Sequence, residues 1–137
     1  MSKSEKPVIA VVGATGAVGE ALLSILSERL GKDARVHALA SEKSLGKTVE
    51  FGRQELDVEV LDSFDFSGVE FALFSAGASI SREHAPRAAK AGAIVIDNTS
   101  EFRYDDDLPL VVPEVNAHEL DSVGPGAIIA NPNCSTI

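Results

Sequence analysis

The sequence has no tryptophan, one tyrosine and one cysteine among its 137 residues. A single cysteine excludes a disulfide within the chain and is typical of the reducing cytoplasm. Few aromatic rings and a net charge of −9 argue against a surface that binds nucleic acid. No apolar run approaches the roughly 20 residues that span a bilayer, and the polar first six residues do not form a secretory signal. We therefore expect a cytoplasmic protein that binds neither nucleic acid nor membranes.

What is present is the composition of one globular domain, because 45% of the residues are hydrophobic and 24% are charged. The three histidines, His37, His84 and His118, show no metal-ligand spacing with each other or with Cys134. The acidic run Asp105–Asp107 is typical of a solvated turn. The sequence therefore predicts no metal site, and we interpret the histidines as structural or surface residues.

Apolar runs with the composition of strands alternate with segments that have helical spacing. Strands are predicted at 7–12, 34–40, 69–74, 93–96, 110–112 and 127–130, with short strands or an irregular hairpin at 49–51 and 56–61. A short turn or helix is predicted near 116–120, and a helix at 81–91 whose first turns Pro86 makes irregular. The first helix carries its apolar residues at helical spacing: Val18, Ala21, Leu22, Ile25, Leu26 and Leu30. Strands that are apolar on both faces and joined through helices predict a doubly wound α/β domain with a mainly parallel sheet and helices on both faces.

A glycine-rich turn lies between the first strand and the first helix. It reads Gly13-Ala-Thr15-Gly16-Ala17-Val18-Gly19. Glycine lets the backbone turn sharply and approach a pyrophosphate, whose charge the start of the helix then stabilises. A tight turn without a ligand is the alternative interpretation. The position directly after a strand of β-branched residues favours a dinucleotide site.

The end of the second predicted strand indicates which dinucleotide is bound. Lys43 with Ser41 and Ser44 is suited to the 2′-phosphate of NADP, whereas Glu42 is suited to the ribose hydroxyl of NAD. A solvated polar loop is a third interpretation. We favour NADP.

Further polar residues follow other strands, at the edge where ligands bind in open α/β sheets. Small residues at Ser75 and Gly77 leave room for a cofactor, and Asn98 either holds a ligand oxygen or caps a turn. Arg103 is suited to a phosphate or carboxylate, or forms a surface ion pair. Cys134 lies among polar residues at a predicted junction of strand and helix, where the helix start favours the nucleophilic thiolate. The alternative is a buried apolar filler.

Together these motifs resemble aspartate-semialdehyde dehydrogenase, in order from Pro7 to the last residue. They are Gly13–Gly19, Ala40–Gly46, Phe74–Gly77, Asp97–Arg103, Val112–Asn116 and Asn131–Thr136. The last block, around Cys134, is the specific one. The resemblance implies a Rossmann-like fold and NADP-dependent reduction of β-aspartyl phosphate to aspartate semialdehyde, with release of phosphate. That reaction belongs to the aspartate pathway, which leads to lysine (through diaminopimelate), threonine and methionine.

The resemblance also implies roles for single residues. Cys134 is the nucleophile, Asn133 shapes its surroundings, and Arg103 holds the substrate phosphate. Thr15 to Val18 contact the pyrophosphate, and Lys43 with Ser44 contacts the 2′-phosphate. The family often has arginine where this chain has Lys43, so the loss of the planar fork weakens the expected preference for NADP.

Family members continue past the cysteine into a second domain that supplies a histidine acid/base, a substrate-binding arginine and most of the surface of a homodimer or higher oligomer. The 137-residue chain ends three residues after Cys134. We therefore expect a cofactor-binding fragment with little or no turnover of its own. Two alternatives remain open: a reductase of the N-acyl-glutamyl-phosphate type, and a non-catalytic nucleotide-binding module.

Overall fold

The computed structural model of the chain describes residues 6–99 and 126–130. The strands in that part are β1 (Val8–Val12), β2 (Arg35–Ala40), β3 (Thr48–Phe51), β4 (Gln54–Val60), β5 (Phe71–Phe74), β6 (Ile94–Asp97) and β7 (Ile128–Ala130). The helices are α1 (Ala17–Arg29) and α2 (Ala78–Lys90), with short 3-10 helices η1 (Gly31–Asp33), η2 (Glu42–Ser44) and η3 (Leu61–Ser63). The expected strand at 110–112 and short helix at 116–120 lie outside the described residues.

The strands form one sheet in the order β3-β4-β2-β1-β5-β6-β7. Each neighbouring pair is parallel except β3 and β4, which form the antiparallel hairpin that the sequence left as one of two options. In the sheet, β2 and then β4 lie on one side of β1. On its other side lie β5, β6 and β7, in that order. The strand order thus reverses between β1 and β5, which confirms the predicted Rossmann-like, doubly wound arrangement.

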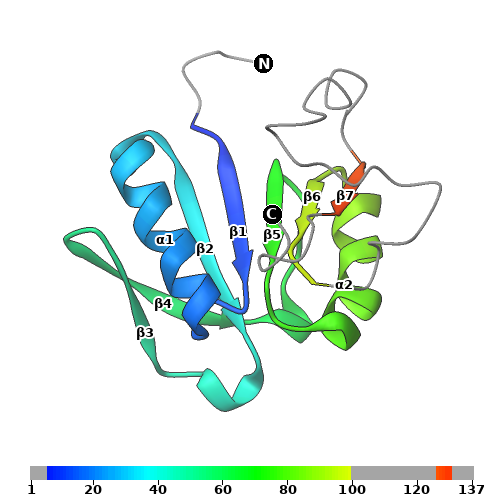
Figure 1. Ribbon diagram of the computed structural model, residues 1–137, viewed down its shortest axis with the longest axis horizontal. Coiled ribbons are helices and arrows are strands. Elements are labelled where there is room, and N and C mark those ends of the chain that lie inside the picture. The colour runs from blue at the N-terminus through cyan, green and yellow to red at the C-terminus, as the bar shows by residue number, and fades with distance from the viewer. Residues whose placement is uncertain (1–5, 100–125, 131–137) are drawn as a thin grey trace, which may run out of the picture.

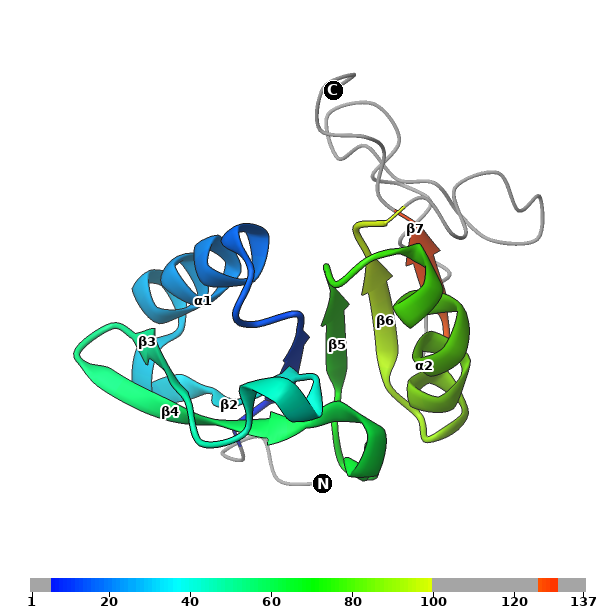
Figure 2. The same ribbon diagram turned by 90° about the horizontal axis from the view of Figure 1, so that it is seen from below.

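The two long helices cover opposite faces of the sheet, α1 beside the half that contains β1 to β4 and α2 beside β5 to β7 (Figures 1 and 2). Successive side chains of β1 point to opposite faces of the sheet, so this strand contributes to the hydrophobic core on each face. Val11 packs with Leu23 of α1, whereas Val12 belongs to a second cluster with Ala85 of α2. Burial of both faces explains why the central strands are apolar throughout.

The connection from β4 to β5 contains no α-helix, although the predicted pattern joined strands through helices. Residues 61–69 instead cover the α2 face with η3 and two phenylalanines. Phe64 and Phe66 meet edge to face with their ring centres 5.0 Å apart, and Phe66 is 2% exposed. An aromatic loop thus supplies the apolar cover that a crossover helix would otherwise give.

The buried face of α1 agrees in part with the predicted stripe. Leu22 and Leu26 pack against the core as predicted, but Val18 and Ile25 are 45% and 48% exposed, and Leu23 is fully buried. At Gly19 the helix backbone packs directly on the turn, because a Cβ there would lie 2.1 Å from the Gly13 carbonyl oxygen.

The second helix begins at Ala78, three residues earlier than predicted, and continues through Pro86. No helix within the described ranges is both long and apolar enough to cross a membrane.

Candidate functional site

The carboxyl ends of five parallel strands are aligned in one row. The register partners in this row are Leu39, Val12, Phe74, Asp97 and Ala130. Because the strands are parallel, the segments that follow them leave the sheet at the same edge. Gly13, Ser75 and Asn98, each predicted as a site residue, are the residues directly after this row.

A pocket of about 400 Å³ opens at this edge, between the two halves of the sheet. Four segments from the strand ends meet there: the glycine turn after β1, the end of β2, the residues after β4, and the start of the loop after β5. Its lining residues are Val12, Gly13, Thr15, Gly16, Ala40, Ser41, Leu61, Asp62, Ser75, Ala76 and Ile80. Five predicted cofactor residues therefore surround one hollow: Gly13, Thr15, Gly16, Ser41 and Ser75.

Each glycine of the turn has its own physical reason. Gly13 has φ +90°, a conformation that other residues rarely adopt, and a Cβ there would approach Ala76 to 3.0 Å. Gly19 has no room for a side chain against the turn. Gly16 has an ordinary φ of −86°, and a Cβ there would meet only the Gly13 carbonyl oxygen, at 3.5 Å. The packing of the protein therefore does not require glycine at position 16.

The start of α1 has no side-chain cap. Gly16 is the N-cap residue and offers no side-chain hydrogen bond, while its amide donates to the Gly13 carbonyl oxygen at 3.0 Å. Ala17, Val18 and Gly19 form the first turn, in which backbone N–H groups and the helix dipole favour an anion. The turn is held in place because the amides of Gly13 and Ala14 both donate to the Leu39 carbonyl oxygen, at 2.9 and 3.1 Å. The arrangement fits a pyrophosphate.

The residues after β2 are only partly gathered at the pocket. Ser41 lines it, whereas Lys43 and Ser44 lie in η2. Ser44 is 8% exposed and its amide donates to the Ser41 carbonyl oxygen at 2.9 Å, so it shapes the loop. Lys43 is exposed and supplies the positive charge of this loop.

At the ends of β5 and β6, hydrogen bonds fix the backbone. The amide and hydroxyl of Ser75 both donate to the Val12 carbonyl oxygen at 3.0 Å, which joins β5 to β1 beside the pocket. Gly77 is the N-cap residue of α2 and does not line the pocket. Asn98 is exposed, and its amide donates to the Phe74 carbonyl oxygen at 2.9 Å.

Asp97, at the end of β6, is a buried carboxylate that was not predicted as a site residue. It accepts hydrogen bonds from the Ser81 and Thr99 hydroxyls, each at 2.8 Å, and from the Thr99 amide at 3.1 Å. These bonds connect α2 to the loop after β6.

Three predicted site residues, Arg103, Asn133 and Cys134, lie outside the described residues. Ala130 closes β7 shortly before Asn133 and Cys134, at the same edge of the sheet as Gly13. Three strand spacings separate β7 from β1, or about 14 Å.

Sequence reasoning did not name six residues of the pocket wall as site residues. Val12, Ala40 and Ala76 directly adjoin predicted site residues, whereas Leu61, Asp62 and Ile80 do not. Leu61 and Asp62 directly follow β4, so the rule that ligands lie beyond strand ends would have found them.

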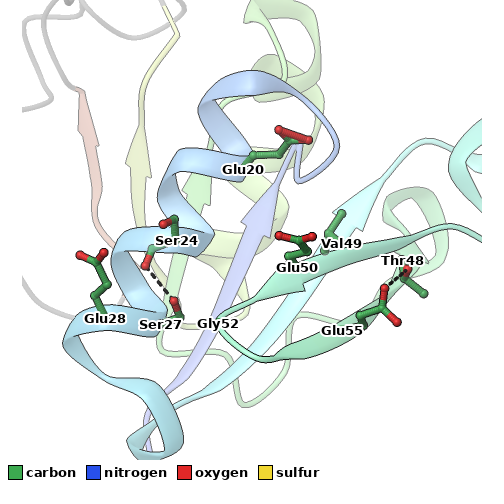
Figure 3. Close-up of a pocket in the computed structure, with 9 residues that line it drawn as sticks. All are labelled: Glu20, Ser24, Ser27, Glu28, Thr48, Val49, Glu50, Gly52 and Glu55. Atoms are coloured by element: carbon green, nitrogen blue, oxygen red, sulfur yellow. Dashed lines mark hydrogen bonds between the residues drawn. The ribbon is translucent and has the colours of Figure 1, made fainter.

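A larger groove of about 670 Å³ lies between α1 and the β3–β4 hairpin (Figure 3). Four carboxylates line it, from Glu20 and Glu28 on the helix and from Glu50 and Glu55 on the hairpin. Its lining residues include no lysine, arginine or histidine. The smaller pocket has one carboxylate among its lining residues, Asp62, and therefore repels phosphates less than this groove does.

Comparison with known proteins supports this assignment. Residues 8–123 match the family model described as "Semialdehyde dehydrogenase, NAD binding domain". An aspartate-semialdehyde dehydrogenase of Legionella pneumophila is 56% identical over 129 residues, which are 94% of this chain and 37% of that protein. The chain thus spans less than half the length of such relatives.

Solved structures agree. Aspartate-semialdehyde dehydrogenase II of Vibrio cholerae, complexed with ASA, superposes with a TM-score of 0.86 at 51% identity, over 96% of this chain and 43% of that one. The Candida albicans enzyme with NADP has a TM-score of 0.72 at 25% identity, over 95% of this chain and 43% of that one. The predicted resemblance to aspartate-semialdehyde dehydrogenases is confirmed, and the chain belongs to the family of semialdehyde dehydrogenase NAD-binding domains.

Proposed function

We propose that this chain is the cofactor-binding part of an NADP-dependent aspartate-semialdehyde dehydrogenase, which reduces β-aspartyl phosphate to aspartate semialdehyde and releases phosphate. One observation carries the proposal: Gly16 has room for a Cβ, faces the strand-end pocket and begins a helix without a side-chain cap. A pyrophosphate explains all three features. The names of relatives at about half sequence identity support the substrate.

The chain's own residues have separate roles in this chemistry. The Cys134 thiolate attacks the acyl carbon of the substrate, so that a carbon–sulfur bond forms, the carbon–oxygen bond to phosphate breaks, and phosphate leaves. Arg103 holds the substrate phosphate, while Asn98 and Asn133 hold substrate oxygens or shape the site. When bound, the nicotinamide cofactor supplies the hydride that reduces the thioester.

The glycine turn and α1 hold the pyrophosphate, and Ser75 with Gly77 allows close approach of the cofactor. Ser41 and Lys43 serve the adenosine 2′-phosphate, and the buried Ser44 holds the loop that carries them. Lys43 supplies charge without the fork of an arginine, so the preference for NADP over NAD is moderate.

The experiment that tests cofactor binding is the substitution Gly16→Ala. The added methyl group has space in the protein, so the unfolding free energy should change by no more than about 1 kcal/mol. The methyl group would occupy the surface on which the pyrophosphate lies, so NADP affinity measured by calorimetry should fall at least tenfold. Ser24→Ala, on the same helix but in the acidic groove, is the control and should bind NADP like the unmodified chain. Unchanged affinity in Gly16→Ala would refute the proposed site.

Cofactor choice is tested by Lys43→Gln, with Lys47→Gln as the matched control on a nearby exposed lysine. Loss of the cation should weaken NADP binding several-fold and leave NAD binding unchanged, because only NADP carries the 2′-phosphate. An equal effect on both nucleotides, or an equal effect of Lys47→Gln, would contradict the assignment.

We also propose that residues 1–137 alone have little or no turnover, because the stretch they match is 37% of such a relative and, by the resemblance, the acid/base histidine and the substrate arginine lie outside that stretch. The full-length enzyme is then a cytoplasmic homodimer or higher homo-oligomer. A steady-state assay with aspartate semialdehyde, phosphate and NADP tests the first point, and turnover at enzymatic rates would refute it.

A further inference from the structure

One carboxylate stands at the mouth of the strand-end pocket. Asp62 lies in η3, directly after β4, and lines the pocket together with the glycine turn. Its side chain is 76% exposed. A carboxylate repels phosphates and accepts hydrogen bonds, so the part of a dinucleotide that is suited to lie beside Asp62 is one that donates them.

We propose, resting on the proposed function, that Asp62 accepts a hydrogen bond from the 6-amino group of the cofactor's adenine. The ADP half of the cofactor has donors on its ribose rings and on adenine. In doubly wound sheets the adenosine ribose is recognised at the end of the second strand, which here is β2 with Ser41. Asp62 follows β4, one strand further out, where the group attached to that ribose lies.

The surroundings of Asp62 suit a flat base. Leu61, Ile80 and Ala40 contribute apolar surface to the same pocket. A purine ring gains from such contact, while its polar edge needs a partner at the rim. Asp62 is the carboxylate among the residues that line this pocket.

The loop that carries Asp62 is held by α2. The Arg87 guanidinium donates to the Leu61 carbonyl oxygen at 2.8 Å and to the Phe64 carbonyl oxygen at 2.6 Å. It also lies 4.9 Å from the centre of the Phe66 ring. A bidentate arginine with a stacked aromatic ring gives the loop a defined position before any ligand arrives.

His84 sets the environment of the Asp62 carboxylate. Its Nδ1 lies 2.9 Å from Arg87, and because arginine can only donate, Nδ1 accepts and Nε2 carries the proton. Nε2 faces an oxygen of Asp62 at 3.3 Å and one of Glu83 at 3.4 Å. These three side chains have the spacing of metal ligands, but a protonated Nε2 cannot bind a metal. The cluster instead presents Asp62 as a hydrogen-bond acceptor.

The test compares NADP with its deamino analogue, in which hypoxanthine replaces adenine and a keto oxygen replaces the amino group. Affinities are measured by calorimetry on the whole 137-residue chain. We expect NADP to bind about tenfold more tightly, because the keto oxygen places two acceptors against each other. In Asp62→Asn the amide can donate to the keto oxygen, so the ratio should fall to about one or invert.

Glu83→Gln is the matched control. Glu83 faces the same histidine nitrogen and is 71% exposed, but it does not line the pocket. It should keep the tenfold preference for NADP. Equal affinity of the unmodified chain for the two nucleotides, or loss of the preference in Glu83→Gln as well, would overturn the inference and leave the proposed function standing. Failure of both nucleotides to bind at millimolar concentration would overturn the proposed function, and this inference with it.

Discussion

Two glycines three residues apart on the same turn have opposite requirements. A Cβ on Gly19 would lie 2.1 Å from the Gly13 carbonyl oxygen and 2.8 Å from the Ala14 Cα. Both are backbone atoms, so they cannot move aside as a flexible side chain can. Gly16 has no such conflict, so packing within the protein does not explain the glycine at this position.

We therefore predict that Gly19→Ala lowers the unfolding free energy by about 1–3 kcal/mol, because α1 must shift away from the turn. Urea denaturation followed by circular dichroism measures the change. Gly16→Ala is the comparison and should be the more stable variant. Equal stability of the two variants would show that the helix can slide on the turn at little cost.

Asp97 is a buried carboxyl group that accepts hydrogen bonds from two hydroxyl groups and one backbone amide. Replacing it with alanine leaves the Ser81 hydroxyl and the Thr99 backbone without their acceptor. We expect Asp97→Ala to cost about 2–4 kcal/mol of unfolding free energy. Ser79→Ala, on an exposed site of the same helix, should change it by less than about 0.5 kcal/mol. A near-neutral Asp97→Ala would mean that water replaces the carboxylate.

Asp65 supplies a prediction about pH. The Ser67 backbone amide donates to its carboxylate at 2.9 Å, and this hydrogen bond, helped by the Ser67 hydroxyl, holds the pKa of Asp65 below its usual 3.8. A carboxyl group with a lowered pKa stabilises the fold above its unfolded pKa, and that contribution is lost as the pH falls through the folded value. Carbon-detected NMR titration of the Asp65 carboxyl should give a midpoint below 3.8. A midpoint at or above 3.8 would exclude the turn hydrogen bond in solution.

At the scale of elements, the loop after β4 takes the place of a helix. The loop has no helical run of apolar residues, and Phe64 and Phe66 cover the sheet in its place. Arg87 of α2 donates a hydrogen bond to the Phe64 carbonyl oxygen and stacks on the Phe66 ring. The stability of this loop therefore depends on a residue more than twenty positions away in the sequence.

We predict that Arg87→Met loosens residues 61–69 before the rest of the molecule. Loss of two carbonyl contacts and of the stacked guanidinium should cost about 2–3 kcal/mol. Hydrogen exchange followed by mass spectrometry should show faster exchange in this loop and near-normal exchange in β1. Arg87→Lys keeps the positive charge but loses the planar guanidinium. Its exchange rate in the loop should therefore lie between those of the unmodified chain and of Arg87→Met. Uniform exchange across the chain would show that the loop has no separate stability.

Most elements could be predicted because their signals are local. The apolar run that ends at Gly13 specifies β1, and the spacing of the apolar residues that follow indicates a helix. The face of that helix could not be read from the spacing, because Val18 and Ile25 fit an apolar stripe as well as Leu23 does. The close contact at Gly19 decides between them, and this contact depends on the path of the turn.

At the scale of the whole molecule, the candidate cofactor site spans the point where the two halves of the sheet meet. Its walls come from β1, β2 and η3 on one side and from the segment after β5 on the other. A ligand there contacts both halves at once, so its binding should stabilise the domain as a unit.

NADP at one hundred times its dissociation constant should add about 2.7 kcal/mol to the unfolding free energy and raise the melting temperature by roughly 10 °C. Differential scanning calorimetry measures the shift, and Gly16→Ala at the same NADP concentration should show little or none. An equal shift in that variant would place the ligand elsewhere on the molecule.

The candidate site could be predicted where the amino-acid sequence shows the ends of strands and the spacing of glycines. Gly13, Gly16, Ser41 and Ser75 could be predicted in this way, and the structure brings them around one pocket. The position of Asp62 after β4 was also predictable, but its contact with His84 was not, because His84 comes from a helix that the fold brings alongside. Contacts of that kind depend on the packing of α2 against the loop, which periodicity does not encode.

The row of glutamates between α1 and the β3–β4 hairpin has a consequence for how a ligand arrives. A dinucleotide carries several negative charges, so these carboxylates should repel it within a Debye length of about 8 Å. We therefore expect it to approach from the strand-end side of the domain. Added salt should screen this repulsion, and it should also weaken the attraction between the start of α1 and the phosphates.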